Sequence, residues 1–420
     1  MHRWEGERGV SGGGQTRAVT STVPPIAAGS PDTGLPDGPA TTTGVWADLI
    51  GQERSVAVLQ RAVAGHAHAM THAWLITGPP GSGRSNAARA FAAALQCPRD
   101  GCGTCTECRT SLSGAHPDVT LVRTEMLSIG VDEVRELVRR ASMSPTLGRR
   151  QVLVIEDADR VTERGADALL KAIEEPAPRT VWILCAPTAD DVVVTIRSRC
   201  RSLTLQTPTI EDVTRLLQTR DGISPELAAS AARAAQGHVG RARALARHES
   251  ARERRRAILE IPFRLKDLPA CLQAAETLVK TAAEEAATAT AELDARERRD
   301  LEEALGFGTK GARPRQAAAA MKDLEEQQKA RAKRLQRDAI DRALTELTGF
   351  YRDLLSVQTR AGASLINDDL APRIAVMARA STPEATLGKI DALLACREAL
   401  EGNVAPLLAM ESTLISLARG

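Results

Sequence analysis

The sequence predicts an α/β domain with a parallel sheet, followed by two all-helical regions. Four short β-rich runs, at residues 73–77, 119–122, 151–155 and 181–185, alternate with helical patterns in the first half of the chain. Strands that are separated by helices form parallel sheets with both faces covered. After Pro208 the β-rich runs stop and apolar residues recur at helical spacing, so the rest of the chain is expected to be helical.

The composition indicates a soluble protein of several domains. A length of 420 residues is enough for two or three domains, and a hydrophobic content of 43% supports a sizeable core. The net charge of +2 gives no strong non-specific attraction to nucleic acid, and an aromatic content of 2% argues against a base-stacking platform. We find neither an apolar run that could cross a bilayer nor a signal peptide. We therefore expect a cytoplasmic protein without a membrane partner.

Changes in composition predict the order of the domains. Residues 1–43 are rich in Gly, Ser, Thr and Pro and are expected to form a disordered tail. Residues 44–206 carry the alternating pattern, and residues 207–250 are expected to form a small helical domain. The helical region 262–420 contains a highly charged stretch, 281–338, which is predicted to be an inserted helical hairpin. The hairpin is either an arm with a function of its own or simply a solvent-exposed extension of the helical bundle.

A glycine-rich loop is predicted between the first strand and the helix that follows it. The stretch Gly-Pro-Pro-Gly-Ser-Gly-Arg-Ser supplies Gly78, Gly81, Gly83, Arg84 and Ser85. Such glycines let backbone N–H groups turn toward phosphates at a helix N-terminus, and the Ser85 hydroxyl is suited to hold magnesium. Arg84 stands where a lysine normally reaches the terminal phosphates, and its longer, forked side chain is not equivalent to a lysine.

Two carboxylates follow the buried strand at 151–155. Magnesium sites of this type place an aspartate at the strand end, followed by a carboxylate that positions water, whereas here Glu156 precedes Asp157. Together with Arg84, this gives two altered positions in one nucleotide site. The sequence leaves open whether ATP or ADP binds here with Mg²⁺, and it predicts that hydrolysis is inefficient.

Four of the eight cysteines lie within twelve residues of one another: Cys97, Cys102, Cys105 and Cys108. In a reducing compartment, such a cluster indicates a metal site rather than disulfides. Four soft ligands at short spacing favour a tetrahedral structural zinc. An iron–sulfur cluster and unmetallated thiols are the alternatives, and His116 could replace one thiolate.

Taken together, these motifs resemble the AAA+ clamp-loader family, and within it the delta-prime subunits of bacterial DNA polymerase III. The stretch Trp-Ala-Asp-Leu-Ile-Gly-Gln at 46–52 is similar to the family's entry motif, and His-Pro-Asp at 116–118 is similar to a signature after the zinc knuckle. Residues 167–176 resemble the helix and turn that follow the carboxylate strand. Ser198, Arg199 and Cys200 match the "SRC" motif.

The resemblance implies an AAA+ domain with a zinc knuckle, a helical lid and a C-terminal collar that joins subunits. Clamp loaders are five-subunit rings of motor ATPases, delta and delta-prime that open a sliding clamp and place it on primed DNA. Delta-prime members commonly lack a working phosphate loop and act as a rigid stator within the polymerase holoenzyme. The arginine of the SRC motif, Arg199 in this chain, reaches in trans into the ATP site of a neighbouring subunit.

Arg199 suits that role chemically. A guanidinium is always charged and presents a rigid fork of donors to phosphate oxygens. The nearest acids before it in the sequence, Asp190 and Asp191, lie eight or more residues back, so we expect no local carboxylate to pair with it. The alternative is an ordinary surface or core-pairing arginine.

Two rival functions remain open at this point. The chain could be an active, ATP-hydrolysing motor subunit of the same complex, or a zinc-bearing protein that binds nucleic acid. Arg84 and the order of Glu156 and Asp157 argue against the motor. So do a proline near the first-sensor position, Pro187, and a glycine at the second-sensor position within 237–241. The near-neutral charge argues against the nucleic-acid binder.

Overall fold

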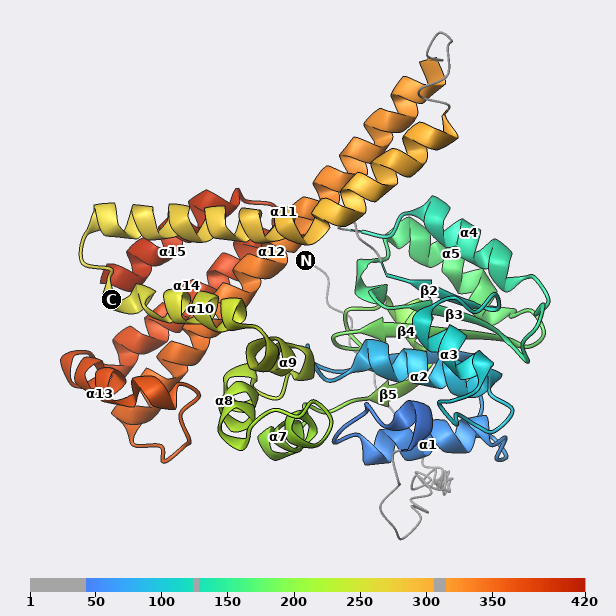
Figure 1. Ribbon diagram of the computed structural model, residues 1–420, viewed down its shortest axis with the longest axis horizontal. Coiled ribbons are helices and arrows are strands. Elements are labelled where there is room, and N and C mark those ends of the chain that lie inside the picture. The colour runs from blue at the N-terminus through green and yellow to red at the C-terminus, as the bar shows by residue number, and fades with distance from the viewer. Residues whose placement is uncertain (1–42, 124–127, 306–314, 420) are drawn as a thin grey trace, which may run out of the picture. The chain divides into compact units, whose positions relative to one another are not determined.

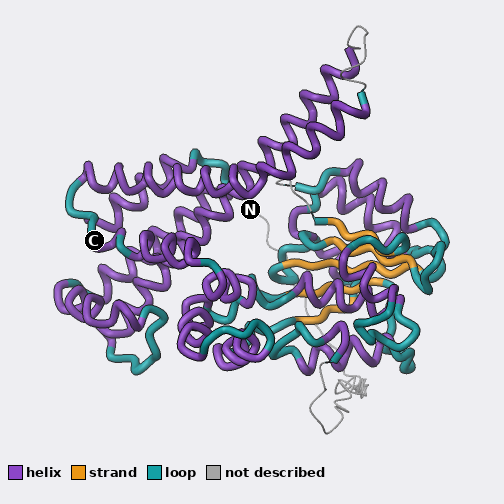
Figure 2. Tube along the Cα trace, in the orientation of Figure 1, coloured by secondary structure: helices purple, strands orange, loops and turns teal. Residues whose placement is uncertain are grey.

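The computed structural model of the protein describes residues 43–123, 128–305 and 315–419. The predicted tail at 1–43 therefore lies outside the described residues except for its last residue. None of the described helices combines the length and the apolar content that a bilayer crossing requires. The first part of the chain is an α/β layer structure, and everything after the last strand is helical (Figures 1 and 2).

A five-stranded parallel sheet organises the first part of the chain, with the strand order β2-β3-β4-β1-β5. Its strands are β1 (Ala73–Thr77), β2 (Val119–Val122), β3 (Gln151–Ile155), β4 (Thr180–Ala186) and β5 (Arg201–Thr204). In the central register, Leu75 of β1 lies opposite Leu184 of β4 on one side and Ser202 of β5 on the other. The strands β1, β3 and β4 are buried along their whole length, which explains their continuous apolar sequences.

Helices cover both faces of this sheet (Figure 1). They are η1 (Gly44–Trp46), α1 (Glu53–Val63), α2 (Arg84–Gln96), α3 (Thr106–Ser113), α4 (Val131–Ala141), η2 (Ala158–Arg160), α5 (Glu163–Glu174) and α6 (Val194–Arg197). One core joins the sheet to α1 and α2 and contains Trp74 packed edge-on against Phe91, with ring centroids 5.1 Å apart. The second core joins the other face to α4 and α5 and contains Trp182. The predicted parallel α/β class is therefore confirmed.

Two details of the predicted elements were wrong. The edge strand β5 was not foreseen, because Arg201–Thr204 carries a single apolar residue, Leu203, and the strand is buried only there. Within 207–250 the sequence predicts helix breaks at both Gly237 and Gly240. Gly237 does lie between two helices, but Gly240 lies inside α9 (Val239–Arg247). The positive φ of Gly237, 83°, suits that turn.

The helices after the sheet form two packed groups. The first consists of α7 (Ile210–Thr219), α8 (Pro225–Ala235) and α9, which share an alanine-rich core. The others are α10 (Glu249–Leu259), η3 (Ile261–Phe263), α11 (Leu268–Ala304), α12 (Arg315–Thr359), η4 (Asp368–Leu370), α13 (Ala371–Ala380), α14 (Pro383–Glu401) and α15 (Pro406–Arg419). Four helices, α11, α12, α14 and α15, supply most of the core of this second group.

The charged stretch at 281–338 belongs to the two longest helices, α11 and α12, which run side by side (Figure 1). The sequence predicts a break between the two arms of the hairpin at 306–314, because this stretch contains three glycines and Pro314. The stretch lies outside the described residues. Between the helices, Arg331 is only 7% exposed, and its guanidinium is held by Asp294 at 2.7 Å and by Glu297 at 3.0 Å. Gln328 adds a hydrogen bond to the carbonyl of Asp294 at 3.0 Å. Paired charges rather than an apolar seam therefore line this part of the helix pair.

Candidate functional site

The glycine-rich loop joins β1 to α2 at the carboxyl end of the sheet, where ligands of open α/β sheets bind. Gly81 and Gly83 have φ values of 86° and 92°, which a residue with a side chain rarely adopts. The backbone N–H of Gly78 is bonded to the carbonyl of Pro187 at 3.1 Å. A Cβ added to Gly81 would lie 2.4 Å from the ring of His238. The loop thus has the predicted strand–turn–helix form, and His238 packs directly against it.

Arg84 begins α2, and its guanidinium turns back onto the loop. It donates a hydrogen bond to the carbonyl of Gly78 at 2.8 Å. Ser85 follows Arg84 in the first turn of the helix. The cation is therefore engaged by the loop's own backbone, whereas a lysine at this position normally reaches the phosphates.

Each carboxylate of the predicted magnesium site has an arginine partner. Glu156, only 7% exposed, accepts a bond from Arg89 Nε at 2.7 Å. Asp157 lies 3.3 Å from a guanidinium nitrogen of Arg334 on α12. The thiol of Cys185, near the end of β4, lies close enough for these charges to affect its pKa. Burial raises this pKa, the carboxylate of Glu156 raises it further, and the positive charge of Arg84 lowers it.

Sequence reasoning missed both arginines. Arg89 lies on α2 one turn beyond the glycine-rich loop, and Arg334 lies 177 residues after Asp157. Arg241, in the predicted second-sensor segment, does not contribute to the nucleotide site either, because its guanidinium pairs with the buried Glu346 of α12. A metal ion at this edge would have to compete with the two arginines for both carboxylates.

The four predicted cysteines are brought together by the turn after α2 and the start of α3. Their sulfur atoms all lie within 4.8 Å of one another, and among the described residues this is the one group with the composition of a metal site. The sulfur of Cys97 is 3.7 Å from those of Cys102 and Cys105. Tetrahedral zinc with Zn–S bonds of about 2.3 Å holds its sulfur ligands about 3.8 Å apart, so the spacing fits one ion.

Hydrogen bonds to sulfur favour the thiolate form of Cys97 and Cys102, whereas burial raises the pKa of Cys105 and Cys108. The N–H groups of Arg99 and Cys102 approach the sulfur of Cys97 at 3.3 and 3.4 Å. The hydroxyl of Thr104, helped by backbone N–H groups, lowers the pKa of Cys102 to about 5. Cys97 and Cys108 are fully buried, while the other two cysteines are partly exposed. The donor set and its surroundings therefore suit a soft divalent cation.

His116 does not belong to the cysteine cluster. Its Nδ1 accepts the backbone N–H of Asp118 at 3.1 Å. The Asp118 carboxylate is 1% exposed and accepts the N–H groups of Thr146 at 2.6 Å and Leu147 at 2.8 Å. Although burial opposes ionisation, these bonds hold the pKa of Asp118 below its usual value. The His-Pro-Asp stretch thus anchors the loop before β3, which its sequence alone did not reveal.

Arg199 lies between α6 and β5, and its carboxylate partner is distant in the sequence rather than local. Its guanidinium lies 2.6 Å from the carboxylate of Glu174, the last residue of α5, and both side chains are 40% exposed. It also donates to the carbonyl of Thr195 at 2.9 Å and lies 3.2 Å from the Ser198 hydroxyl. Burial raises the pKa of the neighbouring Cys200 to about 12, so that thiol stays neutral.

Two family descriptions match the chain. "DNA polymerase III, delta subunit" covers residues 51–209, and "DNA polymerase III, delta subunit, C terminal" covers residues 319–419. The first match takes in the glycine-rich loop, the cysteine cluster and Arg199. The second takes in most of α12 and the helices that follow it.

Three curated relatives illustrate the similarity. The DNA polymerase III subunit gamma/tau of Mycobacterium tuberculosis is 36% identical over 159 residues, 37% of this chain and 27% of that protein. Subunit delta′ of Pseudomonas aeruginosa is 38% identical over 135 residues, 31% of this chain and 41% of its own. Subunit delta′ of Bacillus subtilis is 31% identical over 198 residues, 46% and 59% of the two chains. The matches span less than two thirds of each relative. With both descriptions of the delta subunit matched and relatives named subunit delta′ in different bacteria, the chain belongs to the DNA polymerase III delta-subunit family, together with the subunits named delta′.

Proposed function

We propose that this chain is a non-hydrolysing stator of a clamp-loader ring. The observation that carries the proposal is the state of its nucleotide site. Arg84 is bonded to the loop carbonyl of Gly78, and Glu156 and Asp157 are each paired with an arginine. Phosphoryl transfer needs a cation and magnesium at defined positions, and here the groups that would supply both are engaged within the chain.

Arg199 supplies the second part of the proposal, an arginine finger that acts on a neighbour's ATP. Its only carboxylate partner in the described chain is Glu174, and the pair is exposed to solvent. Exposed ion pairs stabilise a protein by only about 0–1 kcal/mol. Arg199 can therefore exchange Glu174 for a phosphate at little cost, whereas Arg241, paired with the buried Glu346, cannot move so freely.

The proposed partners are those of the relatives' complex: motor subunits of the gamma/tau type and delta in a pentameric ring, with the sliding clamp and primed DNA. The helices within 262–420 would form the collar that holds the ring, and residues 207–250 the lid. Cys97, Cys102, Cys105 and Cys108 would hold a structural zinc. The place of action would be the cytoplasm, at the replisome.

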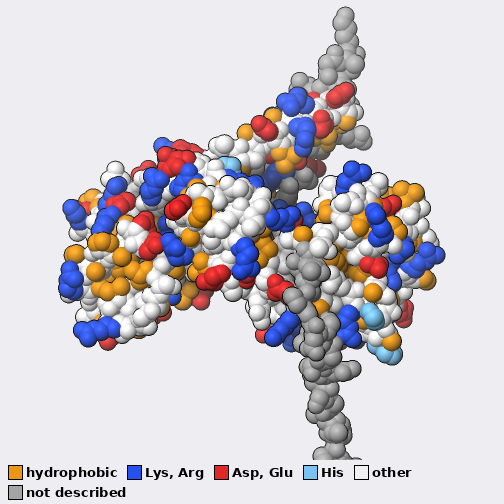
Figure 3. All heavy atoms as spheres, turned by 60° about the horizontal axis from the view of Figure 1, so that its bottom comes forward, with side chains coloured by type: hydrophobic (Ala, Val, Ile, Leu, Met, Phe, Trp, Pro, Cys, Tyr) orange, Lys and Arg blue, Asp and Glu red, His pale blue; other side chains and the backbone are white. Residues whose placement is uncertain are grey.

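The rival functions have less support. An active motor would need Glu156 and Asp157 free for magnesium, and both are paired. A nucleic-acid binder would need a basic band, but on the face drawn in Figure 3 the basic and acidic side chains are interspersed.

The isolated chain is expected to turn over ATP negligibly, and Arg84→Lys is not expected to restore turnover. A lysine would replace the altered cation, but Glu156 and Asp157 would remain paired with Arg89 and Arg334. The measurement is phosphate release by the wild-type and Arg84→Lys chains. Turnover of about 1 s⁻¹ or more, abolished by Ser85→Ala, would show that the site is active.

The test of the proposed function is reconstitution with gamma/tau and delta from the same organism. We expect the full chain to join the ring and to be required for loading a labelled clamp on primed DNA. A chain that ends after residue 250 should keep its folded α/β domain but fail to join, because it lacks the proposed collar. Equal loading rates with and without the full chain would contradict the stator role.

A further inference from the structure

Basic side chains gather at the amino ends of the parallel strands, the edge opposite to the glycine-rich loop. Arg150 precedes β3, Arg179 precedes β4, and Arg201 is the first residue of β5. Since β4 pairs with β3 and β1, and β1 pairs with β5, these strand ends are near neighbours. The backbone N–H of Gln151 is bonded to the carbonyl of Arg179 at 3.1 Å. The sheet therefore places several guanidinium groups along one edge.

A cavity of about 510 Å³ lies at this edge. Its polar lining includes four arginines, a histidine and two threonines, among them Arg150, Arg179, Arg199, Arg201, His72 and Thr71. None of the residues that line it is acidic. Small-molecule sites occupy about 300–1,000 Å³, so the cavity has room for an extended phosphate chain.

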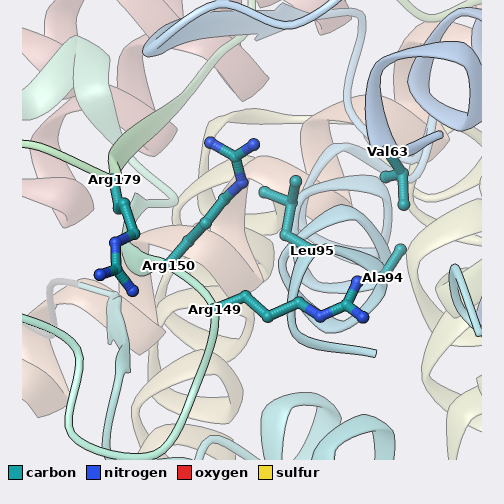
Figure 4. Close-up of a pocket in the computed structure, with 6 residues that line it drawn as sticks. All are labelled: Val63, Ala94, Leu95, Arg149, Arg150 and Arg179. Carbon is teal, nitrogen blue, oxygen red and sulfur yellow. The ribbon is translucent and has the colours of Figure 1, made fainter. Parts of the chain in front are cut away.

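The arginines of this cavity differ in what holds them. Arg201 is fixed by a bond to the carbonyl of Ala69 at 2.6 Å and lies 5.1 Å from the centre of the Trp74 ring. Within the described part of the chain, the guanidinium groups of Arg150 and Arg179 have neither a hydrogen bond nor an ion pair. Figure 4 shows these two side chains beside each other, next to a smaller cavity of about 190 Å³ that they also line. Both guanidinium groups are therefore available to bind an anion that does not belong to this chain.

The two arginines differ in their surroundings: Arg150 is partly buried, whereas Arg179 is exposed to solvent. Burial lowers the pKa of the Arg150 guanidinium, which shows that its charge is partly desolvated without compensation. Arg179 has a φ of 64°, a left-handed conformation that is unusual for a residue other than glycine or asparagine. Such conformations persist where the surrounding structure imposes them, and they are frequent at binding sites.

We propose that this cavity is a polyphosphate site, in which Arg150 and Arg179 bind the phosphate chain of a nucleotide held by a neighbouring subunit, beside Arg199. Several guanidinium groups around one cavity match the several charges and planar oxygen edges of such a chain. The identity of the neighbour as the source of the phosphates rests on the proposed function. The affinity of the cavity for polyphosphate does not, because it resides in this chain alone.

The test is calorimetric titration of the isolated full chain with inorganic tripolyphosphate. We expect saturable binding at one site, weakened about tenfold by Arg179→Gln and by Arg150→Gln, since each removes a charged hydrogen-bond donor. Arg379→Gln is the matched control: it removes the same charge from an exposed position on α13 and should change the affinity less than about twofold. Thermal melting confirms that the variants are folded.

Three outcomes would overturn the proposal: no saturable binding, equal weakening by Arg179→Gln and Arg379→Gln, or loss of binding in Arg84→Gln, which would place the anion in the glycine-rich loop. Displacement of tripolyphosphate by a short primed duplex at micromolar concentration would assign the site to DNA instead. Suppose that Arg179→Gln binds tripolyphosphate as tightly as the wild type, while Arg199→Ala still slows ATP turnover of the assembled complex. This result would contradict the polyphosphate site and leave the proposed function supported. If Arg179→Gln and Arg150→Gln weaken tripolyphosphate binding but Arg199→Ala leaves ATP turnover of the complex unchanged, the polyphosphate site is supported and the arginine finger is contradicted.

Discussion

Replacing Arg199 with alanine is expected to slow ATP turnover of the assembled complex, although this chain hydrolyses nothing itself. In other NTPases an arginine finger accelerates turnover by about 10³–10⁵-fold, because it neutralises charge that develops on the transferring phosphate. The motor site that faces Arg199 should therefore become nearly silent. The total rate of the ring should fall only by the share of that site, since the other motor sites keep their own fingers.

The substitution should not disturb the fold. The side chain of Arg199 is 40% exposed, and its pair with Glu174 contributes at most about 1 kcal/mol as a surface ion pair. Arg197→Ala provides a matched control, because Arg197 lies two residues away and forms a comparable pair with the exposed Asp190. Turnover is measured in complexes reconstituted with the wild-type, Arg199→Ala or Arg197→Ala chain, with clamp and primed DNA present.

The Arg197→Ala control separates the loss of the arginine finger from a general effect on the α6 segment. We expect Arg197→Ala to behave as the wild type and Arg199→Ala to reduce both stimulated turnover and clamp loading, with ring assembly unchanged. Equal rates of ATP turnover and clamp loading in all three complexes would show that Arg199 does not act as a finger and that this chain has only a structural role. Equal losses in both variants would assign the effect to the local structure rather than to Arg199.

The α/β class could be predicted from the sequence because the central strands of the sheet are mostly apolar. β1, β3 and β4 are buried on both faces, so each appears as an uninterrupted apolar run between helical stretches. The edge strand β5 escaped detection for the opposite reason: only Leu203 faces the core, and its neighbours Arg201, Ser202 and Thr204 remain accessible. A short edge strand with polar residues has no pattern that distinguishes it from a loop.

The residues that make up the candidate sites could also be predicted from the sequence, but the ion-pair partners of those residues could not. The glycine-rich loop, the carboxylate pair and the cysteine cluster each lie within a few consecutive residues. The partners that decide their chemistry are distant: Arg89 lies 67 residues before Glu156, and Arg334 lies 177 residues after Asp157. Glu174 meets Arg199 because α5 packs beside α6. Such pairs depend on tertiary packing and leave no local signal in one sequence.

The purified chain is expected to carry one zinc ion, and Cys105→Ser is expected to release it. Serine is the most informative substitution at this position. Cys105 is the N-cap of α3, and its sulfur accepts the N–H of Cys108 at 3.4 Å. A serine hydroxyl caps a helix well, so the variant keeps the cap and loses only the thiolate. Any loss of stability then reports on the metal rather than on the start of the helix.

The loss should be large because the four cysteines that would share the metal belong to the core of the α/β domain or pack against it. Structural zinc contributes about 10–16 kcal/mol to folding in zinc-finger peptides. The turn at 97–105 also packs against the start of the domain, where the Val45 N–H donates to the carbonyl of Gly101 at 3.0 Å. We expect the zinc content to fall from near one ion per chain to near zero. The melting temperature of the α/β domain should fall by about 10 °C or more.

Cys271→Ser provides the control for this experiment, because it makes the same change to a free thiol outside the cysteine cluster, on α11 in the core of the C-terminal helices; Cys271 is more deeply buried than Cys105. It should retain the zinc and shift only the unfolding of those helices, while Cys105→Ser should leave them folded. Elemental analysis and thermal unfolding of the wild type and both variants measure these effects. A wild-type chain with far less than one zinc, or with iron in its place, would contradict the zinc site. Equal zinc content in all three proteins would show that Cys105 is not a ligand.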